Sequence, residues 1–200
     1  MLAMFATAVD AASALSNGDL VAHPTTGLWG IAADPRSDRA MADLARLKQV
    51  PTRQGFIVCG ADAEQFSGWY LNAAAERILA TTFEGPVTVV CDAGPRAPDS
   101  IVSAQSSVAL RVAAHPAPAA LAGTLGCPIV STSLNLPGRP PAADIGSLDP
   151  DLAPLLAGGF ELGPPPRGTG STLVDVRGSE PSVLRQGEVT LAAIQAALSR

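Results

Sequence analysis

Apolar and polar positions alternate along this chain in segments typical of helices separated by buried strands. In residues 5–18 the apolar positions recur at helical spacing, and Asn17-Gly18 supplies a stop signal at the C-terminal end. In residues 37–50, Ser37 is a good N-cap, and one helical face carries a row of apolar side chains. That row consists of Met41, Leu44, Ala45 and Leu47. The pattern predicts two helices in the first quarter of the chain.

Continuous apolar runs follow, and they favour strands that are covered on both faces. They occupy residues 55–60, 86–91, 107–112 and 128–132. We also expect short strands at 19–23 and 172–176, and a Gly-containing loop at 24–35. Further helices are predicted around 71–82 and 116–125 and after Thr190. Strands that alternate with helices predict an α/β layered fold, whose strand order cannot be read from one sequence.

Composition agrees with a folded chain of ordinary size. The chain has 200 residues, of which 47% are hydrophobic and 16% are charged, so a disordered or coiled-coil chain is disfavoured. The length suits one domain that spans residues 1–200, and no internal repeat is visible at periods of about 20 to 50 residues. The formal net charge of -5 argues against nucleic-acid binding over the whole surface and leaves only a local basic cleft for weak RNA binding.

Cysteine usage and the N-terminal segment both bear on where the protein works. Cys59, Cys91 and Cys127 are odd in number and far apart, so no zinc framework or secreted disulfide scaffold is predicted. The N-terminal segment lacks the basic region of a signal peptide, and no run of about 18 apolar residues predicts a membrane span. We therefore expect a cytoplasmic protein with no membrane contact.

Four small polar side chains stand together where one predicted strand ends, and they are the first candidates for a site. They are Ser131, Thr132, Ser133 and Asn135. Ligands of open α/β sheets gather at such strand ends, and the side chains of Ser131, Ser133 and Asn135 share one face if the strand continues. Alternatively, these residues only form local turn hydrogen bonds that release the chain from the strand.

Cations in and beside apolar segments are the second group of candidates. Thr25 follows a strand, Lys48 ends a helix, and Arg111 and Arg185 lie in strand-like stretches. A buried guanidinium needs an anionic partner, and its planar fork suits phosphate or carboxylate. The alternative for each arginine is an ion pair with an acidic residue at a strand edge. No metal site is predicted, and residues 168–172 lack the spacing of a phosphate-binding P-loop.

Six segments in order make the chain resemble a known family over about 170 residues. They are VAHPTTGLWGIAADP, LARLKQVP, GPVT, SVALRVAAHP, PIVSTSLNLPGRPP, and STLVDVRG followed by SVLRQG. This order resembles the YrdC-type threonylcarbamoyl-AMP synthases. The resemblance implies a twisted mixed sheet with flanking helices and an open concave cavity. It also implies an enzyme that uses ATP with Mg²⁺, L-threonine and bicarbonate to make threonylcarbamoyl-adenylate and pyrophosphate, which tRNA-modification proteins then receive.

The resemblance also implies roles for individual residues. Lys48 matches the lysine of a K-x-R motif, Thr25 the threonine of a Y-P-T-E stretch, and Ser133 a serine of an S-T-S-x-N motif, so these three are the catalytic candidates. The nucleotide-binding candidates are Ser107, Arg111, Ser131, Asn135, Ser171 and Arg185.

The chain departs from the family pattern at several positions. Val50 replaces the arginine of K-x-R, and His23 and Thr26 replace the usual Tyr and Glu. Arg53 is the candidate cation that compensates for Val50, although Gln54 stands where a further basic residue is common. Leu134 replaces a small residue and is expected to narrow the cavity. An alternative hypothesis is therefore a catalytically impaired relative that acts as a nucleotide- or RNA-binding module.

Overall fold

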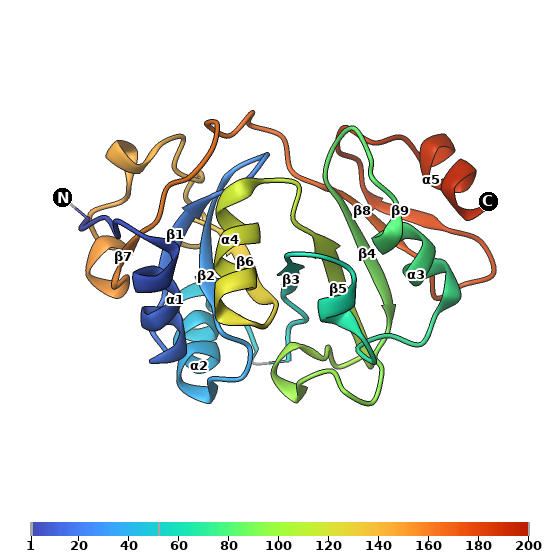
Figure 1. Ribbon diagram of the computed structural model, residues 1–200, viewed down its shortest axis with the longest axis horizontal. Helices are drawn as coiled ribbons and strands as arrows, with labels where there is room; N and C mark the ends of the chain where they lie inside the picture. The colour runs from blue at the N-terminus through green and yellow to red at the C-terminus, as the bar shows by residue number, and fades with distance from the viewer. Residues whose placement is uncertain (1, 52, 200) are drawn as a thin grey trace.

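A twisted mixed β-sheet is the frame of the molecule in the computed structural model, which describes residues 2–51 and 53–199 (Figure 1). The sheet has nine strands within those residues, in the order β7-β1-β2-β6-β3-β5-β4-β8-β9. Three neighbouring pairs, β1/β7, β3/β5 and β4/β8, are parallel, and the others are antiparallel. The strands are β1 Val21–Pro24, β2 Trp29–Ala33, β3 Ile57–Gly60, β4 Val87–Asp92, β5 Ser107–Val112, β6 Ile129–Ser133, β7 Gly158–Gly159, β8 Thr172–Asp175 and β9 Ser182–Arg185.

The α-helices begin where the sequence offers a cap. They are α1 Ala8–Ser16, α2 Asp38–Lys48, α3 Ala73–Ala80, α4 Pro116–Leu125 and α5 Leu191–Leu198. Ser37 and Thr190 accept hydrogen bonds from backbone N–H groups in the first turns of α2 and α5, as the sequence predicts. Short 3₁₀ turns occupy the connections at Glu64–Phe66, Asp99–Ile101, Ile145–Ser147 and Ala153–Leu155. Within the described residues, no helix is long and apolar enough to cross a membrane.

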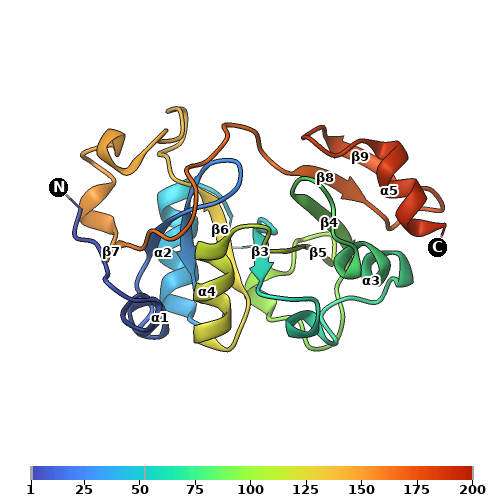
Figure 2. The same cartoon turned by 45° about the horizontal axis from the view of Figure 1, so that its top comes forward.

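The helices cover both faces of the N-terminal half of the sheet. Successive strand residues point to opposite faces, and two apolar cores form accordingly. Ala11 and Leu15 of α1 pack with Leu121 of α4 against one face, and α1 and α4 lie side by side in both ribbon views (Figures 1 and 2). Met41, Leu44 and Leu47 of the apolar row predicted for α2 are buried in the larger core on the other face, together with Ile31 and Val58.

Strand β2 corrects one prediction from the sequence. Residues 24–35 are expected to form a loop because of their glycines, yet Trp29–Ala33 is a fully buried strand between β1 and β6. Glycine suits this position because space for a side chain is tight: an added Cβ would lie 3.0 Å from His23 Nε2 and 3.2 Å from Ser131 Oγ. Close approach of neighbouring strands, and not turn geometry, explains this glycine.

A long segment after β7 crosses from one half of the molecule to the other before it enters β8, as both ribbon views show (Figures 1 and 2). On its way it pairs with the turn between β1 and β2. Arg167 N–H donates to Thr26 O at 2.8 Å, and Gly168 N–H donates to Gly27 O at 2.7 Å. The crossing segment therefore ties the two halves together beside the strand ends. The continuous sheet is compatible with the single domain expected for residues 1–200, which stays a prediction.

We predict that Gly27→Ala destabilises the fold, because the new Cβ would lie 1.9 Å from the carbonyl oxygen of Thr169 and the crossing segment would have to move. Such overpacking costs about 1 to 3 kcal/mol in the free energy of unfolding. Gly123→Ala in α4 is the matched control, because its Cβ would meet only Ala61 at 3.9 Å, and it should gain about 0.5 to 1 kcal/mol. Urea unfolding of both variants checks this. Equal stability of the two would contradict the close packing at Gly27.

Candidate functional site

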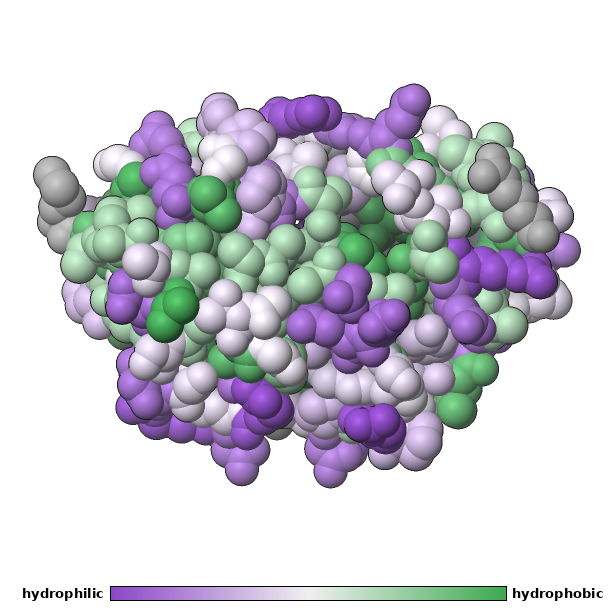
Figure 3. All heavy atoms as spheres, viewed as in Figure 1, coloured by the Kyte–Doolittle hydropathy of each residue, from purple (hydrophilic) through white to green (hydrophobic). Residues whose placement is uncertain are grey.

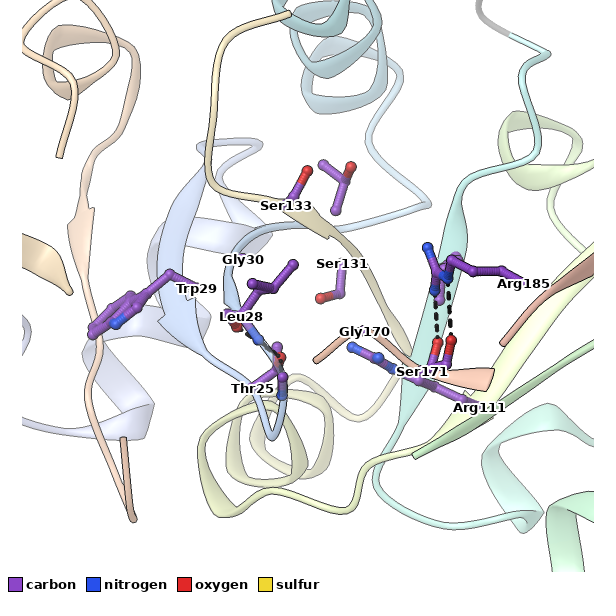
Figure 4. Close-up of a pocket in the computed structure, with 13 residues that line it drawn as sticks. Thr25, Leu28, Trp29, Gly30, Arg111, Ser131, Ser133, Gly170, Ser171 and Arg185 are labelled. Carbon is purple, nitrogen blue, oxygen red and sulfur yellow. Dashed lines mark hydrogen bonds between the residues drawn. The ribbon is translucent and has the colours of Figure 1, made fainter. Parts of the chain in front are cut away.

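A cavity of about 170 Å³ opens between the strand ends of the two halves (Figure 4). The β1–β2 turn and the start of β2 form one side, and β6 forms the floor. The opposite side comes from β5, from the two residues that precede β8, and from the end of β9. The lining residues are Thr25, Gly27, Leu28, Trp29, Gly30, Ile57, Arg111, Ser131, Thr132, Ser133, Gly170, Ser171 and Arg185. No carboxylate is among them, so the charged groups of the lining are all cations.

Arg111 and Arg185 give the cavity its positive side. Figure 4 shows Arg111 reaching from β5 toward Ser131. Arg185 donates from Nε to Ser171 O at 3.1 Å and from a terminal nitrogen to Ser171 Oγ at 3.0 Å, which fixes its guanidinium at the rim. Its pKa lies below the usual value, first because the guanidinium is desolvated and then because Arg111 carries the same charge nearby.

Neither arginine forms an ion pair with an acidic residue in the part of the chain that the structure describes. The alternative of a strand-edge ion pair therefore does not apply to them. Two like charges that face one cavity without a carboxylate favour an anionic ligand.

Ser131 and Ser133 lie on the cavity floor, as predicted from their alternation in β6. Lys48 does not line the cavity. Its ammonium group lies at the end of α2 and donates to Ser133 O at 2.6 Å and to Asn135 O and Oδ1, both at 2.8 Å. Three donors thus meet three oxygen acceptors, and the lysine holds the end of β6 in place. Burial lowers the pKa of Lys48 to about 8.

Asn135 does not share the cavity face that alternation predicts, because β6 ends at Ser133 and the chain turns there. Its amide oxygen accepts from Ser133 Oγ at 2.6 Å as well as from Lys48. Its amide nitrogen donates to Leu136 O and Arg139 O. For Asn135, the interpretation as a local turn residue describes the contacts better than direct ligand contact.

Thr25 lines the cavity, but its hydroxyl is engaged within the β1–β2 turn. Thr25 Oγ1 donates to Leu28 O at 2.7 Å and accepts from the N–H groups of Gly27 and Leu28. This is a side-chain-closed turn of the kind that Ser and Thr commonly form. In this conformation Thr25 shapes the side of the cavity.

Two further candidates lie elsewhere. Ser107 begins β5, at the end away from Arg111, and its hydroxyl bonds Ser103 Oγ at 2.7 Å. Arg53 is exposed and lines a separate hollow with Asp38 and Asp99. The structure therefore does not bring Arg53 to the cavity as a replacement for the missing arginine.

Two of the altered motif positions, Leu134 and Val50, face the core. Leu134 is buried among apolar side chains and is absent from the lining, so the expectation that it narrows the cavity is wrong. Val50 also packs against the apolar core.

His23, noted in the sequence as the replacement for the usual Tyr of the Y-P-T-E stretch, lies beside the site although it was not among the predicted site residues. It is fully buried behind the floor, and its Nε2 lies 3.2 Å from Ser131 Oγ. Trp29 contributes only backbone to the cavity, since Figure 4 shows its ring pointing away. In the sequence, a histidine that alternates with apolar residues in a short strand is most simply interpreted as a core residue. Its contact with Ser131 becomes apparent only when the strands are paired.

A second hollow, of about 330 Å³, is lined by the end of α3, the following loop and residues 112–114. Apolar side chains dominate it, and the surface view shows apolar residues in a hollow on this face (Figure 3). Among residues 2–51 and 53–199, no group of three or more His, Cys, Asp or Glu side chains is placed to hold a metal ion. The cavity at the strand ends differs from this apolar hollow, because its charged lining groups are the cations Arg111 and Arg185.

A cavity at strand ends that presents guanidinium and hydroxyl groups without a carboxylate is a ligand site typical of α/β proteins, and its charge suits an anion. The chain belongs to the Sua5/YciO/YrdC family, because the sequence model of that family, described as "Telomere recombination", matches residues 13–187. The family membership expected from the six sequence segments is thus confirmed.

Relatives that carry a name support the same membership. The threonylcarbamoyl-AMP synthase of Stenotrophomonas maltophilia (strain K279a) is 40% identical over 152 residues, which cover 74% of this chain and 82% of that protein. The threonylcarbamoyl-AMP synthase of Xanthomonas axonopodis pv. citri (strain 306) is 37% identical over 152 residues, with 74% and 81% coverage.

Solved structures confirm the predicted fold. Sua5 of P. abyssi in complex with L-threonine superposes with a TM-score of 0.84 at 26% identity, over 95% of this chain and 56% of that one. YciO of E. coli shares the fold with a TM-score of 0.83 at 21% identity, over 97% and 100% of the two chains. The twisted mixed sheet with flanking helices is therefore the fold of the family.

We predict that Arg111→Ala weakens the binding of inorganic pyrophosphate about tenfold to hundredfold, because a charge-assisted hydrogen bond contributes about 1.5 to 3 kcal/mol. Arg46→Ala is the matched control, because Arg46 is exposed on α2 and pairs only with Asp43. Titration calorimetry at constant ionic strength measures both. A similar loss in the two variants would show that net charge, and not the cavity, determines the affinity.

We also predict that the titration of Lys48 makes stability depend on pH. The pKa is about 8 in the folded chain and 10.5 for an ordinary lysine, so between these values the unfolded chain binds more protons. The contribution of Lys48 to the free energy of unfolding therefore rises with pH across this window and is constant below it. Urea unfolding at pH 7 to 10.5 should show the wild-type value rising relative to Lys48→Met. A falling difference would contradict the lowered pKa.

Proposed function

We propose that this protein is a threonylcarbamoyl-AMP synthase that joins L-threonine, bicarbonate and ATP into threonylcarbamoyl-adenylate and releases pyrophosphate. The observation that carries the proposal is the cavity with Arg111 and Arg185 on one side and Ser131, Thr132 and Ser133 on its floor. The chain is 40% identical over 152 residues to a protein of that name. L-threonine is proposed as the amino acid because the related Sua5 structure contains it.

The reaction needs placement of charged groups more than covalent chemistry from the protein. Threonine and bicarbonate first form a carbamate with loss of water. A carbamate oxygen then attacks the α-phosphorus of ATP, a new P–O bond forms, and the bond to the leaving pyrophosphate breaks. Arg111 and Arg185 would balance the negative charge of the phosphates, and the fixed floor would hold the carbamate in line.

Lys48 contributes to this arrangement through the end of β6. In the conformation described, its ammonium group bonds Ser133 and Asn135 and does not line the cavity. Lys48, predicted as a catalytic residue, would thus position Ser133 for the substrate. Thr25 would shape the opposite side from its closed turn. The cationic role that the sequence suggests for Arg53 receives no support from its place in a separate hollow.

We assign Mg²⁺ to the triphosphate of the incoming ATP, with no site on the protein itself. No carboxylate lines the cavity, and Mg²⁺ commonly keeps waters and substrate phosphates as its ligands. The remaining parts of the proposal follow from the product: a cytoplasmic location and transfer of threonylcarbamoyl-adenylate to tRNA-modification proteins.

The alternative of an RNA-binding module has less support. Six arginines of the described chain form ion pairs with carboxylates, which leaves little unpaired basic surface for a phosphate backbone. They are Arg36, Arg39, Arg46, Arg139, Arg167 and Arg177. The named relatives are synthases as well.

The test is pyrophosphate release by the purified protein with ATP, Mg²⁺ and bicarbonate, with and without L-threonine. We expect a signal that requires threonine. We also expect Lys48→Ala and Ser133→Ala each to abolish it, because the first releases the end of β6 and the second removes a hydroxyl from the floor. Circular dichroism and thermal melting should show that both variants remain folded.

Ser199→Ala is the control for loss of a serine, because its hydroxyl bonds only Gln195 O on the surface of α5. This variant should keep full turnover. Threonine-dependent release that persists in Lys48→Ala would show that the site is wrongly placed. ATP binding without any threonine-dependent release by the wild type would instead favour the impaired binding module.

A further inference from the structure

His23 occupies a closed position between two oxygen atoms behind the cavity floor. Its Nδ1 lies 3.1 Å from the carbonyl oxygen of Pro24, and its Nε2 lies 3.2 Å from Ser131 Oγ. The side chain is fully buried and does not line the cavity, whereas Ser131 does. His23 therefore reaches the cavity only through Ser131.

The partners of His23 assign its tautomer. A carbonyl oxygen only accepts, so Nδ1 carries the proton that is donated to Pro24 O. Burial lowers the pKa of His23 to about 3, so the ring stays neutral and Nε2 keeps its lone pair. Nε2 is then an acceptor, and the hydroxyl of Ser131 must donate to it. The hydroxyl proton of Ser131 is thus engaged by His23, and only the oxygen lone pairs of Ser131 remain for a ligand.

The surroundings keep this arrangement constant over a wide pH range. Two other ionisable groups act on the ring, Arg111 from β5 and His115 at the start of α4, and both disfavour a positive charge on His23. Gly30 leaves the meeting point of His23 and Ser131 open, because an added Cβ would lie within 3.2 Å of both polar atoms.

The hydroxyl of Ser133, two residues further along β6, also uses its proton within the protein. It donates to Asn135 Oδ1 at 2.6 Å, so it also turns lone pairs, and not a proton, toward the cavity. The floor of the cavity accepts hydrogen bonds, and the opposite side, with Arg111 and Arg185, donates them.

We propose that His23 is a positioning residue that fixes the Ser131 hydroxyl as an acceptor, so that the cavity floor selects a ligand group with an N–H donor. The inference rests on the proposed function for the identity of the ligand. There the N–H donor belongs either to the amino or carbamate nitrogen derived from L-threonine or to the exocyclic amine of adenine.

The first experiment tests the tautomer in the wild-type chain without any ligand. The imidazole nitrogens of ¹⁵N-histidine-labelled protein are observed by long-range ¹H–¹⁵N NMR from pH 5 to 8, and His115→Gln assigns the two rings. We expect a protonated Nδ1, an unprotonated Nε2 and no titration of His23. Ser131→Ala should shift the Nε2 resonance, because the nitrogen loses its O–H partner. A protonated Nε2 or an unchanged shift in Ser131→Ala would overturn the proposal.

The second experiment is a binding cycle with His23→Phe, Ser131→Ala and the double variant. The titrated ligands are ATP and L-threonine. We expect His23→Phe to weaken binding of the one that carries the recognised N–H donor about threefold to tenfold, as for one neutral hydrogen bond. In the Ser131→Ala background the same change should have no further effect, because His23 acts only through that hydroxyl. His23→Gln, which keeps an acceptor near the place of Nε2, should restore affinity. Independent, additive losses would overturn the proposal.

Ligand pairs identify the source of the donor. ATP is compared with purine riboside triphosphate, which lacks the exocyclic amine, and L-threonine with 3-hydroxybutanoate, which lacks the amino group. The pair whose discrimination disappears in Ser131→Ala contains the recognised group, and retained discrimination for both pairs would overturn the selection of an N–H donor. Failure of the proposed function is a separate result: the wild type would bind neither ATP nor L-threonine, while the NMR experiment would still decide the role of His23.

Discussion

The contact on which the cavity depends is the one between Lys48 and the turn that follows β6. It joins groups 85 and 87 residues apart in sequence. Fixing a lysine side chain costs up to about 2 kcal/mol of rotamer freedom, and burial penalises its charge as well. The arrangement is stable because each of the three ammonium protons meets an oxygen. Without this tie, the end of β6 would lose the acceptor geometry that orients Ser133 and Asn135.

Charge is sorted between the surface and the cavity. On the surface, most arginines that have a side-chain partner form an ion pair with a carboxylate. Arg39 pairs with Asp19, and Arg177 pairs with Asp175. At the cavity, Arg111 and Arg185 face hydroxyl and backbone groups. An acidic protein can therefore keep a local site for anions while its overall field repels polyanions such as RNA. The net charge of the chain therefore reflects its surface and does not indicate the positive charge of the cavity.

The sequence predicts those features that depend on local chemistry. Caps such as Ser37, the buried row of α2 and most strands are confirmed because their signals lie within a few residues. Strand β2 was missed, since its glycine satisfies a close approach between strands that only pairing reveals. The predictions for Leu134 and Arg53 fail for a related reason. A motif specifies residue types, whereas the direction of a side chain depends on where the strand or loop turns. Asn135 shows this most directly, because alternation stops when β6 ends.

The order of the strands has a consequence for how the site comes into being. Thr25 lies near the start of the chain, and Ser171 and Arg185 lie near its end, yet all three line one cavity. Contacts between such distant segments form late in folding, because the loop entropy must be overcome before the contact is gained. During synthesis from the N-terminus, the first strands can pair while the positive side is still missing. The emerging chain therefore lacks the complete lining of the cavity until β9 has joined the sheet.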